Sequence, residues 1–196
     1  MAIKIISPSI KPKIHSEPRL GEILISRQQI KSRVKELAAE INRDYYQKNL
    51  LVVGILKGAS IFMADLIRHI KVDVQFDYMA VSSYGAATKT SGTVRMLKDL
   101  DENISGHHVL LVEDIIDSGL TLSYLVKNLK SRGPASLEIC SLLRKKGKQR
   151  LTIKARYTGF SIGNEFVVGY GLDFHQKYRH LRDIRILQNP PTGNGY

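Results

Sequence analysis

The sequence has little cysteine, no long apolar run and few acidic residues compared with basic ones. Cys140 is the only cysteine among 196 residues, so the chain can form neither an internal disulfide nor a four-thiolate metal site. No apolar stretch approaches the length of a membrane span, and the first twenty residues lack the apolar core of a secretory signal. We therefore expect a cytoplasmic protein without disulfides or membrane spans.

The charge of the chain is strongly of one sign. Thirty Lys and Arg residues against 18 Asp and Glu residues give a formal net charge of +12. Such a surface suits either nucleic acid or a highly phosphorylated small substrate. Only the segment 144–150, RKKGKQR, is densely basic, and a solvated turn is its simplest interpretation. Charge alone therefore leaves both kinds of partner open.

Alternating apolar patterns predict a single α/β domain over residues 1–196. Ser26 and Gln29 form a capping box ahead of a helix whose apolar face is formed by Ile30, Val34, Leu37, Ile41 and Tyr45. Two strand–turn–helix units follow, starting at LLVVGIL (50–56) and HVLLVED (108–114), and strands are expected at SLEICSLL and FVVGYGLD. Such alternation is typical of a mainly parallel twisted sheet with helices on both faces. The N-terminal segment and the residues after about 145 fit poorly and are expected to form a small hood.

The most informative stretch is VLLVEDIIDSGLT, where an apolar strand ends in acidic residues and a helix begins. Glu113, Asp114 and Asp117 precede a turn formed by Ser118, Gly119, Leu120 and Thr121. Free N–H groups at a helix start suit a phosphate, and the acids can accept hydrogen bonds from a sugar diol or bind Mg²⁺. A polar strand end and a helix cap would explain fewer acids, but three acids at one junction favour the chemical interpretation.

This stretch resembles the phosphoribosyl pyrophosphate motif of the type I phosphoribosyltransferases, and the resemblance covers about Leu50 to Asp183. It implies that the acids contact the ribose hydroxyls and that residues 117–121 hold the 5′-phosphate. Asp117 is usual in the hypoxanthine-guanine branch. Leu120 departs from the many relatives that carry lysine there, which removes one possible phosphate contact.

Other segments extend the resemblance. Leu56, Lys57 and Gly58 look like the pyrophosphate loop, in which the Leu56–Lys57 peptide bond is expected to be cis. Arg179 matches a second pyrophosphate contact, and Ser83 and Tyr84 match the start of a mobile loop that closes over the reacting groups. The purine pocket and a water-mediated Mg²⁺ contact are implied for Lys145, Phe166, Val167 and Asp173. Taken alone, Lys145 would be interpreted as a solvated surface lysine, and Asp173 and Arg179 as a surface pair.

The resemblance implies an Mg²⁺-dependent enzyme of purine salvage. It would transfer the phosphoribosyl group of phosphoribosyl pyrophosphate to hypoxanthine, and also to guanine, giving IMP or GMP and pyrophosphate. Asp117 would act as general base near purine N7, and Glu113, Asp114 and Asp173 would hold Mg²⁺, partly through water. Relatives form dimers and tetramers, so we expect a homo-oligomer with small-molecule partners rather than nucleic acid.

Two alternatives stay open at this point. A regulator with the same fold could bind nucleic acid through its basic surface and sense the phosphoribosyl ligand. A Rossmann or P-loop nucleotide-binding protein is less consistent with the sequence, because neither G-x-G-x-x-G nor G-x-x-x-x-G-K-[ST] occurs. The sequence does not decide whether guanine or xanthine is used besides hypoxanthine.

Overall fold

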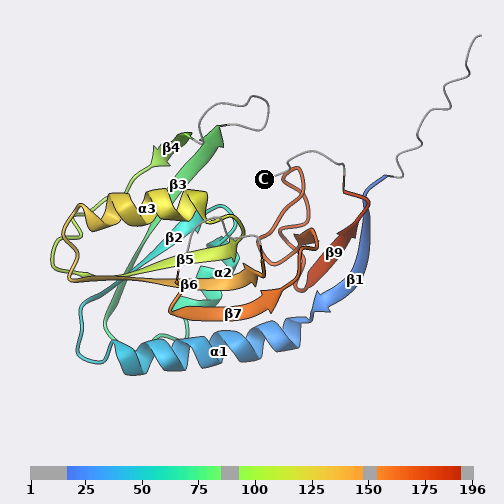
Figure 1. Cartoon of the computed structure of the whole chain (residues 1–196). Helices are drawn as coiled ribbons and strands as arrows, with labels where there is room; N and C mark the ends of the chain where they lie inside the picture. Colours follow the sequence, from blue (N-terminus) through green and yellow to red (C-terminus); the bar gives the residue numbers. More distant parts are fainter. Residues whose placement is uncertain (1–16, 85–92, 148–153, 191–196) are drawn as a thin grey trace, which may run out of the picture.

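The computed structural model describes residues 17–84, 93–147 and 154–190, and its centre is a sheet of six strands (Figure 1). In chain order these are β2 (Leu50–Leu56), β3 (Val74–Tyr84), β4 (Thr93–Lys98), β5 (His108–Ile116), β6 (Ser136–Lys145) and β7 (Tyr157–Ile162). They lie in the order β4-β3-β2-β5-β6-β7, and every neighbouring pair is parallel except β3 and β4. The predicted α/β fold with a mainly parallel sheet is confirmed.

The central strands are apolar because helices cover both faces of this main sheet. Every residue of β2 except Leu56 is buried, and β5 is buried from Val109 to Val112. Continuous apolar runs are typical of parallel strands that are covered on both sides. In β5 the run gives way to Glu113 and Asp114 near the carboxyl end of the strand, and these are its first acidic residues.

The helices are placed by their apolar stripes. α1 (Arg27–Asp44) and α2 (Ser60–Ile67) pack on one face of the main sheet, and α3 (Leu120–Lys130) packs on the other (Figure 1). The predicted capping box forms at the start of α1, where the side chains of Ser26 and Gln29 each accept a hydrogen bond from the other's backbone N–H. All five residues of the predicted apolar face are buried. No helix in the described ranges is long and apolar enough to span a membrane.

A second, smaller sheet joins the two ends of the described chain. It consists of β1 (Arg19–Ile25), β9 (Ile184–Gln188) and β8 (Val167–Val168), in the order β1-β9-β8. The predicted strand at FVVGYGLD was too long: the chain turns away after Val168, because Gly169, Tyr170 and Gly171 have φ angles of 102°, 50° and 102°.

The segment after residue 145 contributes to both sheets. β7 pairs in parallel with β6 and extends the main sheet, whereas β8 and β9 form the smaller one. The residues after 145 are therefore divided between the two sheets, and the small hood stays a prediction. β4 also was not identified from the sequence, because it follows the polar stretch that we interpreted as a loop.

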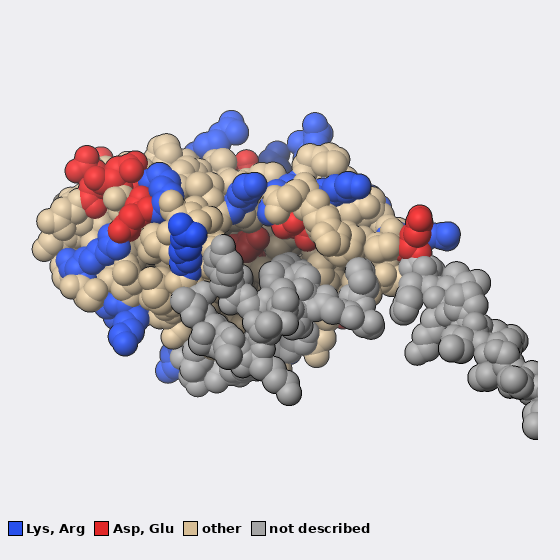
Figure 2. All heavy atoms as spheres, turned by 90° about the horizontal axis from the view of Figure 1, so that it is seen from above, with Lys and Arg blue, Asp and Glu red and all other residues tan. Residues whose placement is uncertain are grey.

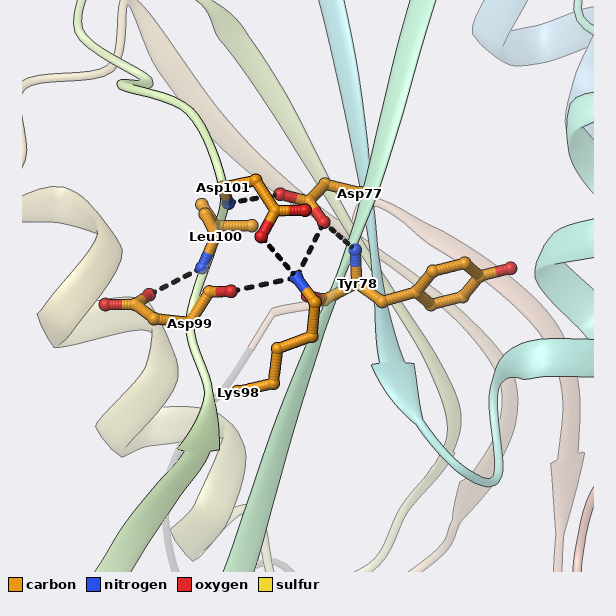
Figure 3. Close-up of polar contacts among 6 residues, drawn as sticks. All are labelled: Asp77, Tyr78, Lys98, Asp99, Leu100 and Asp101. Atoms are coloured by element: carbon orange, nitrogen blue, oxygen red, sulfur yellow. Dashed lines mark hydrogen bonds and ion pairs between the residues drawn. The ribbon is translucent and has the colours of Figure 1, made fainter.

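β4 ends in a compact polar cluster built around the ammonium group of Lys98 (Figure 3). This group lies 2.9–3.1 Å from four oxygen atoms, which belong to the side chains of Asp77 and Asp101 and the backbone of Tyr78 and Asp99. Asp77 also accepts hydrogen bonds from the backbone N–H groups of Tyr78 and Asp101. Burial alone would raise the pKa of Asp77, but these hydrogen bonds and the charge of Lys98 outweigh it and lower the pKa. The cluster thus ties the base of the β3–β4 hairpin to the chain that leads to β5.

We expect Asp77→Asn to lower the free energy of unfolding by about 1–3 kcal/mol at pH 7, because a hydrogen-bonded charge is lost. Since the pKa of Asp77 is lowered by folding, its stabilisation is present above the unfolded value of about 3.9 and is lost as the pH falls through the folded value. Urea titrations at pH 7 and at about pH 3 measure the free energy of unfolding of both proteins. The difference between Asp77→Asn and wild type should be smaller at the lower pH.

The matched control is Asp101→Asn, which removes a carboxylate from the same ammonium group. The side chain of Asp101 is 75% exposed, against 14% for Asp77. We expect its loss to change stability by no more than about 0.5 kcal/mol. Equal losses for the two variants would contradict the assigned role of Asp77.

Candidate active site

The predicted site residues on the main sheet gather at the carboxyl ends of its parallel strands. Lys57 follows β2, Glu113 and Asp114 lie near the end of β5, and Lys145 is the last residue of β6. Ligands of open α/β sheets bind at this edge. In Figure 2 acidic side chains are recessed in the middle of one face, with Lys and Arg side chains around them.

The junction of β5 and α3 leaves the start of the helix without a side-chain cap. Gly119 occupies the N-cap position with a φ angle of 79°, a left-handed conformation that suits glycine. The backbone N–H of Leu120 has only a long contact of 3.5 Å to the Ser118 hydroxyl. Leu120, the first residue of α3, is 45% exposed, and Thr121 follows it in the first turn. An uncapped helix start with its positive dipole end suits a phosphate group.

Asp117 does not cap this helix but pairs with a buried lysine. Its carboxylate lies 3.3 Å from the ammonium nitrogen of Lys145, a residue that is only 3% exposed. A lysine charge at such a position needs an anionic partner. The interpretation of Lys145 as a solvated surface residue is therefore wrong, and the structure brings two predicted site residues together from β6 and the β5–α3 turn.

Glu113 and Asp114 form a pair of acids with little compensating charge. One carboxylate oxygen of Glu113 is buried and has no hydrogen-bond partner within the described residues. Burial, and then the charge of Asp114, raise the pKa of Glu113 well above its usual range. Burial likewise raises the pKa of Asp114 to about 6, although the backbone N–H of Ile115 and the charge of Arg179 oppose the shift. Such acids can accept ligand hydroxyl groups or a cation.

The predicted pyrophosphate loop lies against these acids. The Leu56–Lys57 peptide bond is cis, as the resemblance to the family implied. A side chain at Gly58 would collide with the carboxylate of Asp114, and one at Gly171 would collide with the carbonyl oxygen of Gly58. Glycine at both positions therefore allows the loop after β2, the end of β5 and the turn after β8 to meet.

Arg179 and Asp173 form a half-buried pair at the same place. An Arg179 nitrogen lies 2.6 Å from the Asp173 carboxylate, and another donates to the carbonyl oxygen of Gly171 at 2.6 Å. With side chains 24% and 21% exposed, this is not the surface pair that the sequence alone suggests. Gln176 contacts Lys57, Asp173 and Arg179, although the sequence analysis did not single it out.

Aromatic side chains meet where the smaller sheet approaches this edge. Phe166 precedes β8, and its ring makes an edge contact with Phe174 at a centroid distance of 5.8 Å. Val167 is fully buried in β8. Phe174, which sequence reasoning missed, follows Asp173 directly and in turn contacts the ring of His175. Phe166 thus has an aromatic neighbour on the segment that carries Asp173.

The predicted mobile loop can be located only at its start. The backbone of Ser83 and Tyr84 forms the end of β3, and β4 begins at Thr93. Residues 85–92 lie outside the described residues, as do the side chains of Ser83 and Tyr84. The role of this loop therefore stays a prediction.

No group of three or more His, Cys, Asp or Glu side chains in the described ranges could by itself enclose a metal ion. This arrangement is compatible with Mg²⁺, which is commonly held by one or two carboxylates together with substrate phosphates. The unpartnered carboxylate oxygen of Glu113 could take part in such a shared site.

Two hollows lie away from this edge. The larger, of about 550 Å³, is lined by residues from the last turn of α1, from the segment between α1 and β2 and from the segment before β3, which are Asn42, Tyr46, Gln47, Lys48, Asn49, Lys71, Val72 and Asp73. The smaller, of about 140 Å³, is lined by Asp44, Tyr45, Lys48, His108, Ser136, Glu138 and Arg156. The larger hollow lies beside the residues that precede β2 and β3, and the smaller one includes the first residues of β5 and β6. Both are thus opposite the edge at which α/β sheets bind ligands. The edge that carries Asp114 is therefore the better candidate.

Known proteins resemble this chain over most of its length. The phosphoribosyl transferase domain family matches residues 22–175. The hypoxanthine-guanine phosphoribosyltransferase of Mycobacterium tuberculosis is 48% identical over 190 residues, covering 92% of this chain and 94% of the relative. The enzyme of the same name from Bacillus subtilis is 48% identical over 169 residues, covering 86% and 94%.

Solved structures agree with the sequence relatives. A hypoxanthine-guanine phosphoribosyltransferase from Bacillus anthracis superimposes with a TM-score of 0.81 at 44% identity, covering 87% of this chain and 99% of that one. A hypoxanthine phosphoribosyltransferase from Staphylococcus aureus gives a TM-score of 0.83 at 44% identity, covering 86% and 92%. The chain therefore belongs to the phosphoribosyltransferase family, in the group that these hypoxanthine and hypoxanthine-guanine enzymes form.

Proposed function

We propose that this protein transfers the 5-phosphoribosyl group of phosphoribosyl pyrophosphate to hypoxanthine, and also to guanine, in purine salvage. The products are IMP or GMP and pyrophosphate. The observation that carries the proposal is the ion pair of Asp117 and Lys145 beside the uncapped start of α3. The β5–α3 junction would offer a phosphate site and a base for the incoming purine, and the end of β6 would offer a donor for its 6-oxo group.

The sugar and phosphate contacts follow from the β5–α3 junction. The leading N–H groups of α3 and the hydroxyls of Ser118 and Thr121 would bind the 5′-phosphate, with Gly119 allowing close approach. Glu113 and Asp114 would accept hydrogen bonds from the two ribose hydroxyls. The loss of a lysine contact at Leu120 leaves the backbone amides as the main phosphate donors.

The leaving group needs positive charge, because the bond between the anomeric carbon and pyrophosphate breaks with its electrons moving to the pyrophosphate oxygen. Lys57 and Arg179 lie on the two loops that meet at Gly58 and Gly171, and would stabilise that charge. Glu113, Asp114 and Asp173 are the residues that would hold Mg²⁺, partly through water. When bound, this ion would supply further neutralisation of the pyrophosphate.

The base would be held between Lys145, the Val167 backbone and Phe166. The ammonium group of Lys145 would donate to the 6-oxo group, and Phe166, which is in edge contact with Phe174, would stack on the purine. Asp117 accepts the proton near N7 as the new bond to the anomeric carbon forms. The smaller sheet would act as the hood of this pocket, because Phe166 and Val167 lie at its β8 edge.

We further propose that the protein works in the cytoplasm as a homo-oligomer. The single cysteine, which is buried and free, supports a reducing compartment. The assembly is proposed from the resemblance to the family.

The direct test supplies phosphoribosyl pyrophosphate and Mg²⁺ with each purine in turn and follows nucleotide formation. We expect product with hypoxanthine and guanine, and none with adenine, whose 6-amino group cannot accept from Lys145. Product with adenine alone would overturn the proposal. Salt-sensitive binding to nucleic acid without any turnover would instead indicate a regulator.

We expect Asp117→Asn to lower kcat by about 10²–10⁴, the usual contribution of general acid–base catalysis, with little change in either KM. The amide cannot accept the purine proton. Asp73→Asn, which removes an exposed carboxylate near the opposite edge of the sheet, serves as the control and should leave kcat unchanged. Unchanged turnover of the Asp117 variant, with the protein folded by circular dichroism, would remove Asp117 from the mechanism.

We expect Gly58→Ala to lower kcat/KM for phosphoribosyl pyrophosphate by about 10²-fold, because displacing a positioned group by about 1 Å can have that effect. The added methyl group would displace the Asp114 carboxylate or the loop. In the control Gly163→Ala, the new atom meets only the flexible, exposed carboxylate of Glu165. Steady-state kinetics of both variants should separate the site effect from a general cost of losing glycine.

A further inference from the structure

We propose that Gln176 is a positioning residue for pyrophosphate, whose side-chain oxygen holds the cationic ends of Lys57 and Arg179 next to each other. The inference rests on the proposed function and deepens it. Gln176 would not itself supply charge to the substrate. It would keep two charged side chains from separate loops in the arrangement that the pyrophosphate group meets.

The contacts of Gln176 converge on the residues assigned to pyrophosphate. Its Oε1 atom lies 3.4 Å from the Lys57 Nζ atom and 3.3 Å from an Arg179 terminal nitrogen. Its backbone N–H donates to one carboxylate oxygen of Asp173 at 2.7 Å. The other oxygen of Asp173 lies 2.6 Å from the same Arg179 nitrogen. Gln176 thus bridges the loop after β2 and the segment after β8 with one side chain and one backbone group.

The chemistry of an amide suits this position. Two like charges brought together repel each other, and an acceptor between them offsets that cost. A carboxylate would also neutralise them and compete with the incoming anion, whereas the amide oxygen accepts from both and leaves the positive charge intact. Arg179 keeps one buried nitrogen, Nε, that has no partner among the described residues.

The backbone around Gln176 supports a role beyond packing. His175, Gln176 and Tyr178 have φ angles of 50°, 63° and 74°, which non-glycine residues rarely adopt. Such conformations occur preferentially at functional sites, where the surrounding structure maintains them. Backbone hydrogen bonds in both directions between Phe174 and Lys177 close this turn. Gln176 is nevertheless exposed, so core packing does not explain the conformation.

The test compares Gln176→Met, which keeps the length of the side chain but removes the acceptor, with the wild-type protein. We expect KM for phosphoribosyl pyrophosphate to rise about tenfold, the effect of losing one hydrogen bond to a charged group. KM for hypoxanthine should stay within twofold of wild type, as should kcat. The control is Lys177→Met, which alters the adjacent exposed side chain of the same turn and should change none of these constants.

Product inhibition separates positioning from a structural role. Pyrophosphate should inhibit Gln176→Met about tenfold more weakly, in step with the rise in KM, because it occupies the subsite that Lys57 and Arg179 form. IMP lacks the pyrophosphate group, so its inhibition constant should not change. Loosening of the whole site would weaken both inhibitors, and that result would overturn the inference.

Two more variants test the mechanism of the effect. Gln176→Glu should raise KM for phosphoribosyl pyrophosphate at least as much as the methionine variant, because the new carboxylate would pair with both cations. If Gln176 acts through Lys57, the double variant Lys57→Met/Gln176→Met should raise KM by less than the product of the two single effects. Strictly multiplicative effects would contradict that coupling.

The outcome can be separated from that of the proposed function. Wild-type protein that forms no nucleotide with hypoxanthine would refute the proposed function itself. Active wild-type protein, together with a methionine variant whose KM for phosphoribosyl pyrophosphate and pyrophosphate inhibition are unchanged, would refute only the role of Gln176. Thermal unfolding of each variant shows whether it is folded at the assay temperature.

Discussion

The site depends on two neighbouring half-buried carboxylates, Glu113 and Asp114, that have little positive charge beside them. Glu113 and Asp114 end the apolar run of β5, and the same burial that raises their pKa values keeps one oxygen of Glu113 without a partner. Acids that are removed from water without a compensating partner lower the stability of the protein. Gly58 lies directly against Asp114, so the loop after β2 can approach only because it carries no side chain there. The position of the Asp114 carboxylate therefore requires glycine at position 58.

The cations at this edge differ in how much negative charge lies beside them. Lys145 pairs with Asp117 on the side of the purine pocket. Arg179 pairs with Asp173 and also donates to the Gly171 carbonyl oxygen and the Gln176 side chain. Lys57 is exposed and contacts only a neutral amide among the hydrogen bonds that its side chain makes within the described residues. The charge of Lys57 is therefore available where a leaving group would carry negative charge. The charge of Lys145, near the purine, is balanced by Asp117.

The elements with strong local signals could be predicted from the sequence, and the edge elements could not. The capping box and the apolar stripe predicted α1. β2 was recognised as a strand because its continuous apolar run is shorter than a buried helix. β4 and β7 lie at the two edges of the main sheet, where one-sided pairing leaves shorter and more polar strands. Val167 and Val168 look like the start of a long strand, but three successive positive φ angles end it, and only two of those residues are glycine.

The same distinction applies to the site. Acids and glycine at the β5–α3 junction are adjacent in the sequence, so their pattern was visible before the fold. The environment of Lys145 was not, because its burial and its pairing with Asp117 depend on the register of β6 beside β5. Gln176 was harder still to recognise, because nothing in the sequence distinguishes it from any other exposed glutamine. Its position between Lys57 and Arg179 arises from a turn with unusual φ angles. Residues that carry charge in this site can thus be found from the sequence, whereas a residue that arranges those charges becomes visible only once distant loops have been brought together.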